Sequence, residues 1–130
     1  MLRTRMSAIR FCAVVLAAGS STRMPGKHKL LLPLGDEPVI RRTARGVLAA
    51  GPVETVVVTG NQAQAVAGAL SGVPVRIEFN PRHEEGQMTS VAAGVAALSR
   101  SCDAIMICLG DMALLERADS VRAPRGFWDY

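Results

Sequence analysis

The chain has 130 residues, of which 49% are hydrophobic, 20% charged and 4% aromatic. This length fits one domain with a buried core and leaves little room for a second domain. A mean hydropathy of +0.24 argues against a disordered chain. No apolar run reaches the roughly 18–20 residues that a membrane span needs. Three cysteines without a CxxC pair are typical of reduced thiols, so we expect a cytoplasmic protein without membrane contact.

Positive charge is concentrated in the first third of the chain. Residues 1–45 carry a net charge of +7, whereas residues 46–130 carry −3. A basic segment indicates an anionic partner, either a nucleic acid or a phosphorylated small molecule. Nucleic acid is disfavoured because no aromatic side chains that could stack on bases lie between the cations. A solvated basic surface is the plain alternative.

The first apolar segment, residues 11–17, follows a basic decapeptide and therefore resembles a signal peptide. Its apolar length is near the minimum for such a signal, and it runs directly into a glycine-containing loop. A strand that is covered on both faces explains the same continuous apolar and β-branched residues better. We therefore expect residues 1–10 to be a basic extension and the folded domain to begin at residue 11.

Helix-like and strand-like segments alternate after this strand. A loop rich in Gly, Ser and Pro occupies residues 18–35. Apolar residues at helical spacing then begin after Pro38, which suits a first helical turn, and end at Gly51. Three further strands are predicted, of which the first and last are buried and the middle one is weaker and alternating: 54–59, 75–79 and 104–109.

Two more helices are predicted between these strands. Asn61 is a suitable N-cap for the first, and its apolar side consists of Ala63, Val66 and Leu70. The second helix covers residues 90–98, with an apolar stripe of Val91, Val95 and Leu98. This order of elements implies parallel strands joined by right-handed crossovers. We therefore expect a Rossmann-like three-layer α/β/α fold with a mostly parallel sheet.

A strand order of 3-2-1-4 would make the first and fourth strands neighbours. Ligands of such sheets bind at this switch point, beyond the carboxyl ends of the strands. The first strand ends at the loop that contains Gly19 and Lys29, and the fourth ends at Gly110 and Asp111. We therefore expect the loop and Asp111 to face each other.

The loop after the first strand carries groups that bind phosphate. Besides glycine backbone N–H groups it offers two hydroxyls and three cations, namely Ser20, Ser21, Arg23, Lys27 and Lys29. Its spacing matches neither the P-loop nor the GxGxxG fingerprint. The composition indicates a polyphosphate site, with a basic surface turn as the alternative.

Asp111 complements this loop. A carboxylate that follows a buried strand and faces phosphate-binding cations is a suitable ligand for Mg²⁺, although a Gly-Asp pair can also form an ordinary turn. His83 and Glu84 begin an HExxH pattern, but Gln87 replaces its second histidine, so no zinc site is expected. His28 is interpreted as a loop residue that forms a hydrogen bond or faces water.

Several segments resemble the MobA-like nucleotidyltransferases and, among them, the molybdenum-cofactor cytidylyltransferases. The segments are 16–24 followed by 29–34, then 80–81 with 85–91, and finally 109–112. They occur in the family's order, although Ala113 stands where the family commonly has proline. The resemblance implies a nucleotide-diphospho-sugar transferase-like fold. It also implies Mg²⁺-dependent transfer of a nucleoside monophosphate to a phosphorylated acceptor such as molybdopterin, with release of pyrophosphate.

The resemblance also implies roles for single residues. Arg23 and Lys29 would be catalytic, gripping the triphosphate and neutralising the reacting phosphate, and Asp111 would bind Mg²⁺. The nucleotide-binding set would be Leu16, Ala17, Ala18, Gly19, Ser20, Ser21, Arg23, Lys29 and Ser90. Leu-Ala-Ala-Gly goes with cytidine nucleotides in the cofactor branch, so CTP is the expected nucleotide. Relatives that act on sugar phosphates or other alcohol phosphates share these four residues, so those acceptors stay open.

The resemblance covers only part of the family domain. Family members continue well beyond the Gly-Asp motif with loops that bind the acceptor. We therefore expect residues 11–115 to be the N-terminal portion of the nucleotidyltransferase domain and residues 116–130, with three aromatic residues in the last four positions, to be an atypical tail. The alternative to an enzyme is a truncated domain that binds nucleotide and transfers nothing.

Overall fold

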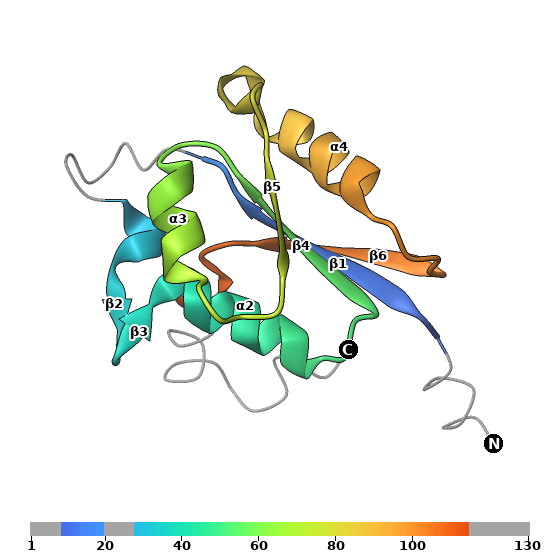
Figure 1. Cartoon of the computed structure of the whole chain (residues 1–130), viewed down its shortest axis with the longest axis horizontal. Helices are drawn as coiled ribbons and strands as arrows, with labels where there is room; N and C mark the ends of the chain where they lie inside the picture. The colour runs from blue at the N-terminus through green and yellow to red at the C-terminus, as the bar shows by residue number, and fades with distance from the viewer. Residues whose placement is uncertain (1–8, 20–27, 115–130) are drawn as a thin grey trace, which may run out of the picture.

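The computed structural model describes residues 9–19 and 28–114. Within these residues a parallel sheet has the order β5-β4-β1-β6 (Figure 1). Its strands are β1 (Phe11–Ala17), β4 (Glu54–Thr59), β5 (Arg76–Phe79) and β6 (Ala104–Leu109). The predicted α/β fold, the four strands and the order 3-2-1-4 are confirmed.

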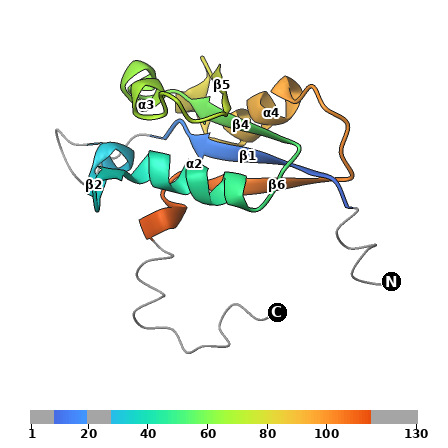
Figure 2. The same ribbon diagram turned by 60° about the horizontal axis from the view of Figure 1, so that its bottom comes forward.

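Helices cover both faces of this sheet, as Figures 1 and 2 show. Helices α2 (Val39–Ala49) and α3 (Ala63–Ala69) contribute to the core on one face, and α4 (Gln87–Ala97) packs on the other. The three layers therefore follow the prediction. None of the helices in the described residues is long and apolar enough to cross a membrane.

Strand β1 lies at the centre of the core because it pairs with both β4 and β6. Its side chains alternate between the two faces, as the two-residue period of a strand requires. Ala13 and Val15 pack in the cluster with α2 and α3, whereas Val14 packs in the cluster under α4. All three side chains are fully buried.

Helix α2 follows the predicted spacing. Ile40, Ala44 and Val47 lie in the core beneath it, and the helix is followed by Gly51 at a φ of +84°. Glycine adopts such a left-handed conformation without a steric penalty, so Gly51 suits the chain reversal after the helix.

The loop predicted over residues 18–35 is more structured at its end than expected. It contains the 3-10 turn η1 (Lys29–Leu31) and the short strand β2 (Pro33–Leu34). This strand pairs antiparallel with β3 (Glu37–Pro38) through a turn at Gly35, whose φ is +71°. Elements this short lack the periodicity by which longer ones are recognised in a sequence.

Helix α3 has a different N-terminus from the predicted one. Gln62, not Asn61, precedes its first residue, and Gln62 adopts a left-handed φ of 53° without a capping side-chain hydrogen bond. The amide N–H of Asn61 instead donates to the carbonyl of Ala18 at 3.1 Å. Asn61 therefore ties the end of β4 to the end of β1.

Helix α4 also differs from its prediction. It begins at Gln87, three residues early, directly after the 3-10 turn η2 (His83–Glu85) and Gly86. Of the predicted apolar stripe, Leu98 packs against the core, whereas Val95 is 39% exposed. Gly94 is buried instead, because an added Cβ would lie 2.3 Å from a methyl group of Val14 and 2.9 Å from one of Val58. The absent side chain lets the helix approach the sheet closely.

Strand β6 is only half buried, which corrects its prediction as a fully buried strand. Cys108 faces the α2 side and is 1% exposed, whereas Ile105 and Ile107 are 42% and 43% exposed. Helix α4 packs against β1 and β4, so it leaves this apolar face of β6 open. The predicted 116–130 tail and most of the predicted 1–10 extension lie outside the described residues.

Candidate functional site

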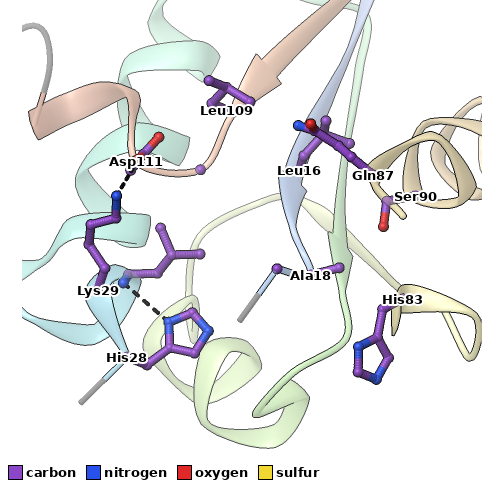
Figure 3. A pocket seen from close by; sticks show the side chains of 12 residues that line it. Leu16, Ala18, His28, Lys29, His83, Gln87, Ser90, Leu109 and Asp111 are labelled. Carbon is purple, nitrogen blue, oxygen red and sulfur yellow. Dashed lines mark hydrogen bonds and ion pairs between the residues drawn. The ribbon is translucent and has the colours of Figure 1, made fainter. Parts of the chain in front are cut away.

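A cleft of about 330 Å³ lies at the carboxyl ends of β1 and β6 (Figure 3). Its lining comes from the strand ends, η1, η2 and the start of α4. These residues are Leu16, Ala18, Gly19, His28, Lys29, Leu30, His83, Gln87, Ser90, Leu109, Gly110 and Asp111. The cleft therefore occupies the switch point at which the strand order predicts ligand binding.

Lys29 and Asp111 form an ion pair in this cleft. The Lys29 Nζ lies 3.0 Å from the Asp111 Oδ2, and the two side chains are 43% and 26% exposed. Figure 3 shows the lysine extending from η1 toward the aspartate that follows β6. The loop and the aspartate thus meet as the strand order predicts. Ser20, Ser21, Arg23 and Lys27 lie outside the described residues.

A backbone contact fixes Asp111 relative to β1. The Gly110 N–H donates to the Leu16 carbonyl at 2.8 Å. A Cβ on Gly110 would lie 2.8 Å from the same oxygen, so only glycine fits without displacement. On the other side of Asp111, the Ala113 N–H donates to the buried Thr43 hydroxyl of α2 at 3.1 Å. The segment that carries the carboxylate is therefore held at both ends.

The Ala18 side of the cleft is closely packed. Ala18 is 3% exposed, and Gly60 lies so near that an added Cβ would be 2.9 Å from the Ala18 methyl and 2.5 Å from the His83 side chain. Ala17 is also buried but belongs to the core on the opposite face, so its side chain does not line the cleft. Among the residues expected to bind nucleotide, Ala17 can therefore act only through its backbone.

Ser90 is buried at the edge of the cleft, where Asn80 positions it. The Asn80 Nδ2 donates to the hydroxyl oxygens of Ser90 and Thr89 at 2.9 Å each. The Asn80 Oδ1 accepts from the Arg82 N–H at 2.9 Å. Asn80 itself is 2% exposed. The sequence places Asn80 in a family motif but assigns it no role, since side-chain hydrogen bonds across a turn leave no periodic signal.

His28 is a second residue whose position the sequence does not reveal. The sequence predicts a loop residue that forms a hydrogen bond or faces water, and the structure shows the first alternative, since His28 is only 4% exposed. The Nδ1 accepts from the Leu30 N–H at 3.2 Å and caps η1. Among the residues that the structure describes, the buried Nε2 has no hydrogen-bond partner. Burial lowers the pKa of His28, and the nearby backbone of Gly19 and Asn61 partly opposes this shift.

The donor set in the cleft fits a magnesium ion that arrives with a phosphate ligand. In the described part of the chain no three His, Cys, Asp or Glu side chains form a metal-binding group, and Asp111 is the acidic residue that lines the cleft. Magnesium is usually held by one or two carboxylates together with water and substrate phosphates. A single carboxylate beside a lysine, the side chain of which can contact a phosphate, suits that mode of binding.

The parallel sheet with a cleft at its switch point defines a doubly wound α/β domain of the kind that binds ligands at this place. The sequence model of the MobA-like NTP transferase domain matches residues 13–123. The chain therefore belongs to the MobA-like NTP transferase family.

Similar proteins agree with this assignment. Bifunctional protein GlmU of Agrobacterium fabrum is 35% identical over 85% of this chain and 25% of its own length. GlmU of an Anaeromyxobacter species is 38% identical over 84% of this chain and 23% of its own length. This chain thus spans about a quarter of these curated relatives. The relatives do not single out the molybdenum-cofactor branch that the sequence resembles.

Solved structures give the same picture. A nucleotidyl transferase from Methanothermobacter thermautotrophicus has 40% identity and a TM-score of 0.73, over 78% of this chain and 50% of that chain. Rv0371c from Mycobacterium tuberculosis has 28% identity and a TM-score of 0.68, over 88% of this chain and 60% of that chain. A manganese complex of Rv0371c is also similar, with a TM-score of 0.63.

Proposed function

We propose that this domain binds a nucleoside triphosphate together with Mg²⁺. It then catalyses the transfer of the nucleoside monophosphate to a phosphorylated acceptor, and pyrophosphate is released. The main support is the pairing of Lys29 with Asp111 at 3.0 Å in the switch-point cleft. Transfer at a phosphorus atom requires positive charge around the reacting phosphates. A lysine that binds phosphate and a carboxylate that binds the metal ion, placed side by side, would supply it.

CTP is the proposed nucleotide, and CMP is the group transferred. The Leu-Ala-Ala-Gly sequence at residues 16–19 supports this choice by its resemblance to cytidine-specific relatives. The structure adds a physical reason, because the Ala18 methyl packs closely beside Gly60 and His83. A wall of this kind narrows the space for a base and favours a pyrimidine over a purine. Ser90, held by Asn80, lies near enough to line the same cleft.

The acceptor phosphate is the proposed nucleophile. Its oxygen attacks the α-phosphorus, and the bond between that phosphorus and the oxygen bridging to the β-phosphate breaks, so that pyrophosphate leaves with the electron pair. A phosphate is already anionic near neutral pH, so no general base is needed. Lys29 and, outside the described residues, Arg23 neutralise the growing negative charge. Mg²⁺ held by Asp111 would supply further positive charge at the phosphates.

Molybdopterin is the proposed acceptor because of the cofactor branch that the sequence resembles. A sugar phosphate or another alcohol phosphate is the alternative, since relatives with the same four residues at 16–19 act on such acceptors. A nucleotide-binding domain that transfers nothing is a second candidate function.

Pyrophosphate release tests transfer, and direct binding tests the second candidate. In the first experiment the protein is incubated with MgCTP and either molybdopterin or a sugar phosphate, and the pyrophosphate released is measured. In the second, equilibrium dialysis measures the binding of CTP, ATP and GTP. We expect CTP to bind more tightly than the purine nucleotides. Asp111→Ala should reduce pyrophosphate release by at least about tenfold, which corresponds to about 1.4 kcal/mol. Undiminished release in Asp111→Ala would refute the metal-binding role, and binding without release would favour the second candidate.

A further inference from the structure

We propose that Lys29 competes with the divalent metal ion for Asp111. In the ligand-free protein the Lys29 ammonium forms an ion pair with the Asp111 carboxylate. When a polyphosphate binds, the ammonium contacts the phosphate instead, and the carboxylate becomes free to bind a metal ion. This inference rests on the proposed function because it concerns the same cleft. It goes beyond that function because it states that the affinity for the metal ion depends on whether the nucleotide is bound, and that Lys29 causes this dependence.

The geometry puts the ammonium where a cation would bind. The Lys29 Nζ lies 3.0 Å from the Asp111 Oδ2, and Lys29 has no other ion pair among the described residues. A metal ion on the same oxygen would replace the ammonium. A metal ion on the other carboxylate oxygen would lie within a few ångströms of it and be repelled.

The exposure of the pair allows exchange. The two side chains are 43% and 26% exposed, so the contact breaks without leaving a buried charge unpaired, unlike an interior ion pair. The two residues differ in how far their side chains can move. Asp111 is held through Gly110 and Ala113, whereas Lys29 reaches it through a flexible four-carbon chain. The lysine is therefore the partner that moves.

A triphosphate would attract the ammonium more strongly than one carboxylate does, because it presents several anionic oxygens. Once Lys29 contacts phosphate, the Asp111 carboxylate is open to a metal ion. Phosphate binding then raises metal affinity, and by linkage metal binding raises phosphate affinity to the same degree. Among the described residues no three side chains form a metal-binding group. This agrees with an order of binding in which the phosphate binds before the metal ion.

The first arm of the test measures Mn²⁺ binding without nucleotide, with free Mn²⁺ followed by electron paramagnetic resonance. Lys29→Met keeps the length of the side chain and removes its charge, whereas Lys29→Arg keeps the charge. We expect Lys29→Met to bind Mn²⁺ about 1.5- to 5-fold more tightly than the wild type, the range set by exposed ion pairs. Lys29→Arg should not bind it more tightly.

Two controls separate the contact from general charge. Arg42→Met removes a positive charge on α2 outside the cleft, and it should leave Mn²⁺ affinity unchanged within experimental error. In an Asp111→Asn background, Lys29→Met should bring no gain, because the shared carboxylate is gone. Equal Mn²⁺ affinity in the wild type and Lys29→Met would overturn the inference. A gain that persists in the double variant, where the carboxylate is absent, would overturn it as well.

The second arm measures MgCTP binding by equilibrium dialysis on the same variants. Lys29→Met should weaken MgCTP while it tightens Mn²⁺, and such opposite signs do not arise from partial unfolding. MgCTP that binds equally well to both proteins would overturn the proposed transfer of the lysine to phosphate. A wild type that binds no MgCTP would instead refute the proposed function, and the Mn²⁺ arm would still decide whether Lys29 occupies the metal position.

Discussion

The Gly110 N–H donates to the Leu16 carbonyl at 2.8 Å, and this contact joins the ends of β6 and β1 at the floor of the cleft. It places Asp111, the next residue, in the cleft that Gly19, after the end of β1, also lines. The ion pair with Lys29 depends on this placement, because both partners are carried by segments that leave adjacent strands.

Gly110→Ala tests this contact. The added methyl would lie 2.8 Å from the Leu16 oxygen and 3.2 Å from the Leu30 side chain, so the backbone at Asp111 must shift. We expect the free energy of unfolding to fall by about 1–3 kcal/mol, as for other overpacked sites, and MgCTP binding to weaken. Urea unfolding and dialysis measure the two effects. An unchanged stability would show that the turn accommodates a side chain and that the fit is not required.

A matched pair of glycines tests the close approach of α4. Gly94→Ala should destabilise the protein by about 1–3 kcal/mol, because its methyl would lie 2.3 Å from Val14. Gly46→Ala on α2 would meet no described atom within 4 Å. Alanine is favoured over glycine within a helix, so this second substitution should stabilise the protein by about 0.5–1 kcal/mol. Thermal unfolding of both variants checks the opposite signs.

Asn80→Ala tests how Ser90 is positioned. The substitution removes a buried amide that donates to Thr89 and Ser90 and accepts from the Arg82 N–H. Thr89 keeps its bonds to the carbonyls of Arg82 and Gly86, but the Ser90 hydroxyl and the Arg82 N–H lose this partner, which should lower the free energy of unfolding by about 1–3 kcal/mol. Gln64→Ala, at an exposed position on α3, is the control and should change stability by less than about 0.5 kcal/mol. Similar values for the two variants would contradict the role of Asn80.

His28 should make stability depend on pH. Its pKa in the folded protein lies below the ordinary value of 6.5 because the ring is buried. As the pH falls through about 6.5, the unfolded chain therefore takes up a proton before the folded protein does. The stabilisation is complete above that pH and is lost as the pH falls toward the folded pKa. Urea unfolding between pH 5 and pH 8 measures this loss, which His28→Asn should reduce.

Two substitutions distinguish the contributions of the two ring nitrogens of His28 to stability. An asparagine oxygen lies near the position of Nδ1 and can accept from the Leu30 N–H, whereas a glutamine nitrogen reaches toward the position of Nε2. Since Nδ1 carries the observed hydrogen bond, His28→Asn should be more stable than His28→Gln at pH 8. The reverse order would show that the buried Nε2, not the cap of η1, is what the fold requires.

The sequence predicts the sheet well because its strands are continuous apolar segments. The predicted bounds of residues 11–17, 54–59 and 104–109 are those that the structure has. Such β-branched and apolar segments favour buried strands, and the handedness of the connections then limits how they can be ordered. The meeting of Lys29 with Asp111 follows from that order.

The positions that the sequence misses depend on neighbours that are distant along the chain. Whether β6 is buried depends on where α4 packs, and α4 packs on β1 and β4 because Gly94 fits against Val14. The burial of His28 depends on where η1 packs, and η1 contacts α2 and α3. No local pattern records either contact.

The amino-acid sequence by itself determined the parallel sheet, its strand order and the point at which Lys29 and Asp111 meet, because hydrophobic periodicity and connection handedness are properties of the chain. Tertiary structure alone decided which glycines must lack a side chain, which polar groups are buried and which face of β6 stays open. These features are set by the packing of one element on another, and packing is decided by shape at contacts between distant residues.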